Sequence, residues 1–121
     1  MTWTRIDHVQ LAMPAGRELE AEAFYVVVLG FEVHPKPEPL ASRGGRWFEA
    51  GPVVVHLGVE ENFTPAQKAH PALVSDDLDG VVEAVVVGGY GVRWDTDLPD
   101  RRRCYVDDPF GNRIELIDGR S

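Results

Sequence analysis

The sequence predicts an α+β fold made of two copies of one strand-helix-strand-strand-strand unit. Short alternating segments bounded by Gly and Pro residues are typical of strands, and two longer segments carry apolar residues at helical spacing. These segments occur in the same order in both halves of the 121-residue chain. A chain of this length forms one compact domain, so we expect residues 1–121 to fold as a unit with modules at about 4–60 and 68–118.

In the first half, Arg5 to Met13 alternates like a strand and is ended by the sequence PAG. Arg17 to Leu29 has apolar residues at helical spacing, with Gly30 as a C-terminal cap, although three consecutive valines weaken the helix prediction. A Pro-rich surface loop interrupts the strands that follow, which we place at residues 31–34, 46–50 and 53–59.

The second half begins again with a strand at His70 to Ser75. The following DDLDG segment offers N-cap residues for a helix that continues through residues 81–87. Three more strands complete this half, with the turn PFGN between the last two, and we place them at residues 88–94, 102–108 and 112–117.

The two halves also share residues, which indicates an internal repeat. The segment VVVLGFEV (26–33) matches VVVGGYGV (85–92), HVQLA (8–12) matches HPALV (70–74), and VVHLG (54–58) matches RIELI (113–117). This alignment pairs His8 with His70 and His56 with Glu115. Four potential metal ligands therefore fall at two equivalent positions of a repeated unit.

Strand alternation predicts that each of these four residues lies opposite an apolar face. Gln10 shares the face of His8, whereas Val9, Leu11 and Met13 point the other way. Glu115 likewise lies between Ile114 and Leu116. Because a carboxylate and several imidazoles converging in a half-buried cleft are costly without a cation, we predict a metal site formed by His8, His56, His70 and Glu115.

Composition excludes several classes of partner. The net charge of -8 repels phosphate backbones and anionic membrane surfaces, so we expect neither nucleic acid nor a membrane as a partner. The N-terminal residues do not resemble a signal peptide, which favours a cytoplasmic location.

The single cysteine, Cys104, cannot form an internal disulfide and is expected to be a buried, reduced thiol.

Five segments together resemble the vicinal oxygen chelate superfamily, which contains glyoxalases, bleomycin-resistance proteins and extradiol dioxygenases. They are IDHVQLAM, FYVVVLGFEV, VVVHLGV, HPALVSDDLDG and DDPFGNRIELID, and they cover about Arg5 to Asp118. The resemblance implies paired βαβββ modules that curl into a half-open barrel enclosing a metal cleft. It also implies a homodimer, with the site inside one chain or shared between two. The metal ligands of the family correspond to His8, His56, His70 and Glu115.

The function implied by the resemblance is that of an enzyme whose divalent metal chelates neighbouring oxygens of a small substrate. Imidazole-rich ligation suits Zn, Ni, Fe or Mn. A lyase or isomerase is favoured and a dioxygenase comes next. Glyoxalase I-like lyases carry a glutamate at the position of His56, whereas extradiol dioxygenases use two histidines and one glutamate, a set that His8, His70 and Glu115 would supply. Fosfomycin-resistance thiol transferases use the same set, but no phosphonate pocket is evident in this sequence.

Glu115 is also the candidate catalytic base. The candidate substrate contacts are Gln10, Phe48, Trp94, Arg103 and Tyr105. An alternative function remains open, because metal-free members of the superfamily sequester drugs such as bleomycin between aromatic walls. The residues of this chain that could form such walls are Trp47, Phe48, Trp94, Tyr105 and Phe110.

Overall fold

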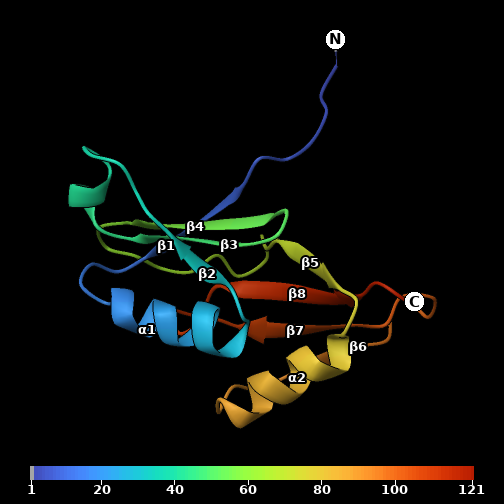
Figure 1. The fold of residues 1–121 in the computed structure, drawn as a ribbon. Helices are drawn as coiled ribbons and strands as arrows, with labels where there is room; N and C mark the ends of the chain where they lie inside the picture. Colours follow the sequence, from blue (N-terminus) through green and yellow to red (C-terminus); the bar gives the residue numbers. More distant parts are fainter. Residues whose placement is uncertain (1) are drawn as a thin grey trace.

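The computed structural model describes residues 2–121 and contains two four-stranded sheets, with helices on one side of both (Figure 1). The first module contains β1 (Val9–Met13), α1 (Glu18–Glu22), η1 (Ala23–Val28), β2 (Glu32–His34), η2 (Ala41–Arg43), β3 (Arg46–Ala50) and β4 (Val53–Val59). The second contains β5 (Ala72–Ser75), α2 (Leu78–Val87), β6 (Arg93–Asp95), β7 (Arg103–Asp107) and β8 (Arg113–Asp118).

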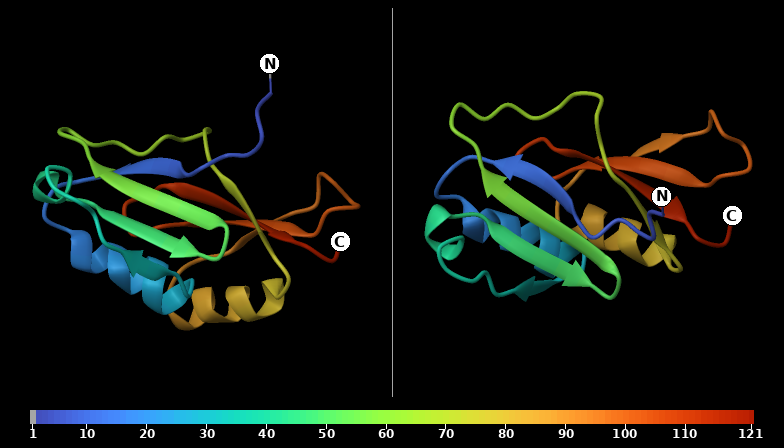
Figure 2. Two further views of the ribbon diagram at one scale, coloured as in Figure 1. Left: turned by 45° about the horizontal axis from the view of Figure 1, so that its top comes forward. Right: turned by 90° about the horizontal axis from the view of Figure 1, so that it is seen from above.

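The two sheets have the same topology, which confirms the predicted tandem modules. Their strand orders are β1-β4-β3-β2 and β5-β8-β7-β6. In each sheet the first strand pairs in parallel with the last strand, and the other pairs are antiparallel. Two views of the molecule show both sheets with α1 and α2 on the same side (Figure 2). Among the described residues, the opposite faces of both sheets are free of α1, η1 and α2, and only the short 3-10 helix η2 borders the first sheet on that side.

The first helix departs from regular α-helical geometry at Ala23, three residues before the run of valines. It is α-helical only over α1 and continues as the π-helical segment η1, in which the Leu29 amide donates to the carbonyl of Phe24, five residues earlier. Consecutive β-branched residues crowd the preceding turn of an α-helix, and a wider turn relieves that crowding. Gly30, at a φ of 80°, ends the segment as the sequence predicts.

The apolar faces of both sheets form the core against the helices. Met13, Val55 and Leu57 are buried in the first module, and Ile114 and Leu116 are buried in the second, as the strand alternation predicts. Cys104 is buried on β7, also as expected. No helix within residues 2–121 is long and apolar enough to cross a membrane.

A buried carboxylate joins the two modules. Asp108, in the turn before β8, accepts hydrogen bonds from the Tyr25 hydroxyl (2.7 Å) and from the backbone and side-chain amides of Asn112 (both 2.9 Å). The Asn112 side chain also donates to the carbonyl of Ala12 on β1 at 2.8 Å. The turn DPFGN of the second module therefore binds both the helix and the first strand of the first module.

Candidate metal centre

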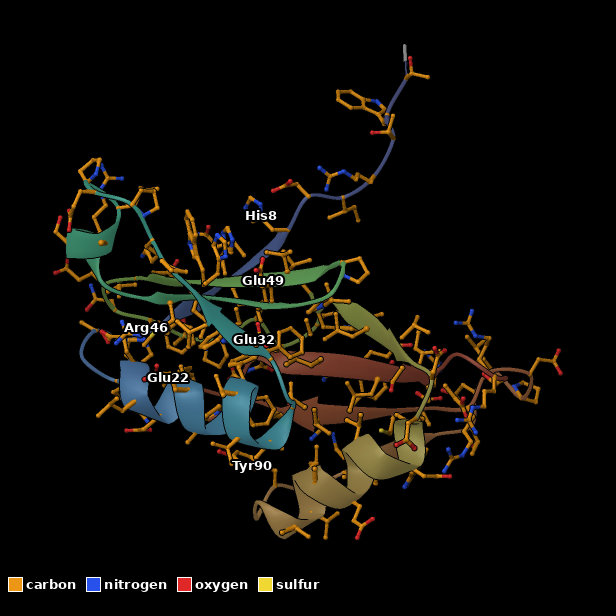
Figure 3. All side chains as sticks on the ribbon, in the orientation of Figure 1. His8, Glu22, Glu32, Arg46, Glu49 and Tyr90 are labelled. Carbon is orange, nitrogen blue, oxygen red and sulfur yellow. The ribbon has the colours of Figure 1, made fainter. Side chains whose placement is uncertain are left out.

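The first module brings His8 and His56 together on the helix-free face of its sheet. Their rings stack with centroids 4.1 Å apart, and Figure 3 shows His8 at the start of β1, on the side away from the helices. The Nδ1 atom of His8 lies 2.9 Å from a carboxylate oxygen of Asp7. Burial and the neighbouring His8 lower the pKa of His56. The neutral form of His56, which can bind a metal, is thereby favoured.

The same face carries a row of further rings across the sheet. Trp47 stacks on His56 with centroids 4.2 Å apart, and His34 lies 6.2 Å from Trp47 on its other side. Cross-strand pairing explains the row, because His56 is opposite Trp47 and Trp47 is opposite His34. The row borders an open cavity of about 660 Å³ that Lys36 and Arg43 also line.

The second module brings His70 and Glu115 together on the equivalent face. The Nε2 atom of His70 lies 3.0 Å from Glu115 Oε1, and its Nδ1 lies 2.7 Å from the carbonyl oxygen of Lys68. The other oxygen of Glu115 accepts from Arg103 at 3.1 Å, and Arg103 also donates to Asp95 at 3.2 Å. Glu115 is therefore held at both oxygens, and only 7% of the residue is exposed.

The environment of Glu115 favours its ionised form. Burial alone would raise the pKa of this carboxyl, but the hydrogen bonds from His70 and Arg103 outweigh the burial and hold the pKa below its ordinary value. An ionised, immobilised carboxylate is the form that binds a divalent cation.

His8 and His70, which the repeat pairs, are oriented in the same way. In each, an oxygen acceptor lies at Nδ1, from Asp7 in one case and from the Lys68 backbone in the other. Metal-ligating histidines usually donate one ring N–H to such an oxygen, which fixes the ring and leaves the other nitrogen for the metal. Nε2 is thus the candidate metal-binding atom in both residues, and in His70 this atom lies 3.0 Å from Glu115 Oε1.

The structure brings the four predicted ligands together in two pairs. No group of three or more His, Cys, Asp or Glu side chains is arranged around one potential metal position within residues 2–121 of a single chain. The pairs are His8 with His56 and His70 with Glu115, each on its own sheet. The donor types and ring orientations fit a transition metal, but each module presents only half of a ligand set.

The five predicted substrate contacts fall in different places. Gln10, Arg103 and Tyr105 lie on the same faces as the ligands, because Gln10 is paired with His56 and Tyr105 with Glu115. Phe48 is fully buried and stacks on Tyr25, so it is a core residue rather than a substrate contact. Trp94 is paired with the buried Cys104 and therefore lies on the opposite side of its sheet from Tyr105.

Two further residues lie on this face: Trp47, which the sequence suggested only as a wall residue of the metal-free alternative, and Asp7, which it did not suggest. Trp47 occupies the place expected for Phe48, and the apolar pairing of Phe48 with Val55 could have shown which of the two points to the core. Asp7 contacts His8, and its position directly before a candidate ligand was the only signal for it.

The fold and these faces define an α+β protein of paired βαβββ modules that carry imidazole and carboxylate groups on their open sides. A family model described as a glyoxalase-like domain matches residues 10–117. The chain therefore belongs to this family of the vicinal oxygen chelate superfamily, which confirms the resemblance.

Solved structures agree with this assignment. A protein of Bacillus anthracis assigned to the glyoxalase family is 47% identical, with a TM-score of 0.93 over 98% of this chain and 97% of that one. A glyoxalase family protein from Enterococcus faecalis is 21% identical (TM-score 0.73; 98% and 100% covered). The fosfomycin resistance protein FosX from Listeria monocytogenes is 15% identical (TM-score 0.75; 98% and 95%). The last two show a shared fold alone. No curated protein matches the chain.

Proposed function

We propose that this protein is a divalent-metal-dependent enzyme that chelates neighbouring oxygens of a small substrate, with its metal held between two copies of the chain. In this arrangement the first module of one copy faces the second module of the other and completes a half-open barrel. His8 and His56 come from one chain, and His70 and Glu115 come from its partner. A homodimer of this kind contains two equivalent sites.

The observation that carries this proposal is the matching orientation of His8 and His70. Repeat-related histidines in both modules have an oxygen acceptor at Nδ1, and in each module a second predicted ligand lies beside that histidine: the His56 ring stacks on His8, and Glu115 lies 3.0 Å from the Nε2 atom of His70. Histidines with purely structural roles have no reason to share this arrangement across a repeat. Two incomplete ligand sets of the same design are expected to combine.

The donor set also suits the proposed chemistry. Three imidazoles and one carboxylate favour Zn, Ni, Fe or Mn over Mg or Ca, and they leave a divalent site with a net positive charge. When bound, such an ion acts as a Lewis acid that stabilises negative charge on a substrate oxygen. Among the charged residues that line the cavity beside His56, three basic ones outnumber two acidic ones, which further favours a substrate that is or becomes anionic; they are Arg5, Lys36 and Arg43 against Asp7 and Glu49.

The protein residues have separate roles in the proposed reaction. Glu115 is the proposed base, since it is the one carboxylate in the ligand set, and Arg103 holds its second oxygen in place. Tyr105, next to both His70 and Arg103, and Gln10, opposite His56, are proposed to contact the substrate. Proton transfer by Glu115 fits a lyase or isomerase. A dioxygenase comes second, because His56 beside His8 occupies a position that its substrates would need.

Complementation between inactive chains tests the shared site. One chain carries His8→Gln and His56→Gln, the other carries His70→Gln and Glu115→Gln, and two different tags allow the mixed dimer to be purified. If the site is shared, the mixed dimer contains one intact and one empty site, so it binds half the metal of the wild type, while neither parent binds any. Metal bound is measured by mass spectrometry after dialysis and tag removal.

The same experiment identifies the alternatives. A mixed dimer without metal would show that each site lies within one chain. Wild-type protein without metal, and without a gain in melting temperature on adding Zn, Ni, Fe or Mn, would instead support the metal-free binding protein. The structure gives that alternative little support, because two of its candidate wall residues, Phe48 and Phe110, are buried.

Arg103 is expected to control metal affinity through Glu115. An Arg103→Met variant should bind metal about 10–100-fold more weakly, because Glu115 loses the donor that orients its second oxygen, and Arg103→Lys should lie in between. Competition titration with a chromophoric chelator measures the change. Arg93→Met is the matched control, since Arg93 forms a two-bond ion pair with Asp107 on the same sheet but does not touch a ligand. Equal effects of the two substitutions would reject the role of Arg103.

A further inference from the structure

The segment before β1 is an extended arm that leaves the body of the molecule. Residues 2–8 form no helix or strand, and every one of them is exposed. Figures 1 and 2 show the arm projecting from the sheets on the side without helices. Among the hydrogen bonds and ion pairs of residues 2–121, those of the arm are local, between Asp7 and its neighbours Arg5 and His8.

This arm carries two large apolar side chains that the described part of the chain leaves mostly exposed. Trp3 is 87% exposed and Ile6 is 78% exposed. Apolar groups of this size on an extended segment gain free energy when another surface covers them, and an extended backbone has free donors and acceptors to offer. Both features are typical of a segment that adds to the edge of a sheet.

The edge strand β5 offers a surface to which such an arm could add. This strand is at the end of its sheet, because within residues 2–121 it pairs with β8 on one side and with no strand on the other. Ala72 and Val74 lie on the face that also carries Glu115, and both are exposed, Val74 at 57%. A free edge with exposed apolar residues is a site where another strand can add.

We propose that the arm of one copy lies antiparallel along β5 of the second copy, with Ile6 on the face of Val74 and Trp3, three residues earlier, on the opposite face. This inference rests on the proposed function, in which His8 of one chain meets His70 of the other. The two histidines occupy equivalent positions of the repeat, so a local two-fold axis is expected to pass between them. About such an axis the two segments are antiparallel, and the residues before His8 lie beside the residues after His70. Thr4, four residues before His8, then lies opposite Val74, four residues after His70.

The dimensions and symmetry of the two segments agree with this contact. Six residues from Thr2 to Asp7 span about 20 Å when extended, which exceeds the length of the four-residue strand β5. In a two-fold dimer the contact forms twice, once for each arm. The arm thereby covers the free edge of β5 next to the shared site. The same contact that stabilises the dimer also fixes where His8 lies relative to His70 of the second copy.

A disulfide between Thr4→Cys and Val74→Cys tests the contact directly. A chain with both substitutions, oxidised gently as the purified protein, should form a covalent dimer at least about tenfold faster than a control with Thr4→Cys and Val87→Cys. Val87 is an 81% exposed residue on α2, away from β5. The native Cys104 does not compete, because it is buried and burial raises the pKa of its thiol.

A second variant tests the apolar anchors. Trp3→Ser with Ile6→Ser should raise the dissociation constant of the dimer about tenfold or more in sedimentation equilibrium, whereas Val87→Ser should leave it unchanged. A wild-type monomer, a cross-link within one chain, or equal cross-linking in the control would overturn the proposal. A metal-loaded dimer without the cross-link would reject the arm contact alone, and a cross-linked dimer that binds no metal would reject the proposed function alone.

Discussion

A Glu115→Gln variant is expected to bind Zn, Ni, Fe or Mn about a hundredfold more weakly than the wild type. Glutamine keeps the shape of the side chain and can still accept a hydrogen bond from Arg103, but it removes the negative charge that attracts the cation. The loss should be measurable by isothermal titration with each metal. At metal concentrations that saturate the variant, turnover should still be strongly reduced, because the amide cannot act as a base.

The matched control is a histidine on the same surface that belongs to neither ligand pair. His34 lies at the end of the ring row beside Trp47 and contacts Glu49, so His34→Gln should leave metal affinity unchanged. Full turnover by Glu115→Gln with normal metal content would reject Glu115 as the base. Normal affinity in the variant would reject it as a ligand as well.

Tyr25→Phe is expected to lower the free energy of unfolding by about 1.5–3 kcal/mol. The substitution removes the hydroxyl that donates to the buried carboxylate of Asp108 and leaves one oxygen of that carboxylate with fewer donors. Urea unfolding followed by circular dichroism measures the change. Tyr90→Phe serves as the control, because the Tyr90 hydroxyl has no side-chain hydrogen bond among the described residues, and a change of about 0.5 kcal/mol or less is expected.

The cost of Tyr25→Phe should depend on pH in a defined direction. Burial raises the pKa of Asp108 above its ordinary value of 3.8, and the hydrogen bonds from Asn112 and Tyr25 oppose that rise. The Tyr25 hydroxyl therefore stabilises the ionised carboxylate more than the protonated acid. The destabilisation should grow as the pH rises through the native pKa of Asp108 and should be smaller below it. A cost independent of pH would show that the hydroxyl acts on packing alone.

The arrangement of the modules was largely predictable from local patterns. Strand alternation placed Val55 and Leu57 in the core and His56 on the opposite face, and the repeat placed His8 and His70 at equivalent positions. The prediction failed at β3, where an error of one residue moves a side chain to the other face of the sheet. Trp47 and Phe48 are both aromatic neighbours on one strand, and only the pairing of Phe48 with the apolar Val55 decides which one meets the cavity.

The sequence by itself determined the faces on which the four candidate ligands lie, because the side-chain period of a strand is fixed by backbone geometry. Only the tertiary structure decided which of these ligands meet. The parallel β1–β4 and β5–β8 ladders bring together His8 with His56 and His70 with Glu115. Contacts between the modules instead run through Asp108, Tyr25 and the core on the helix side. Packing of the apolar faces set that arrangement, and it leaves the two ligand pairs apart within one chain.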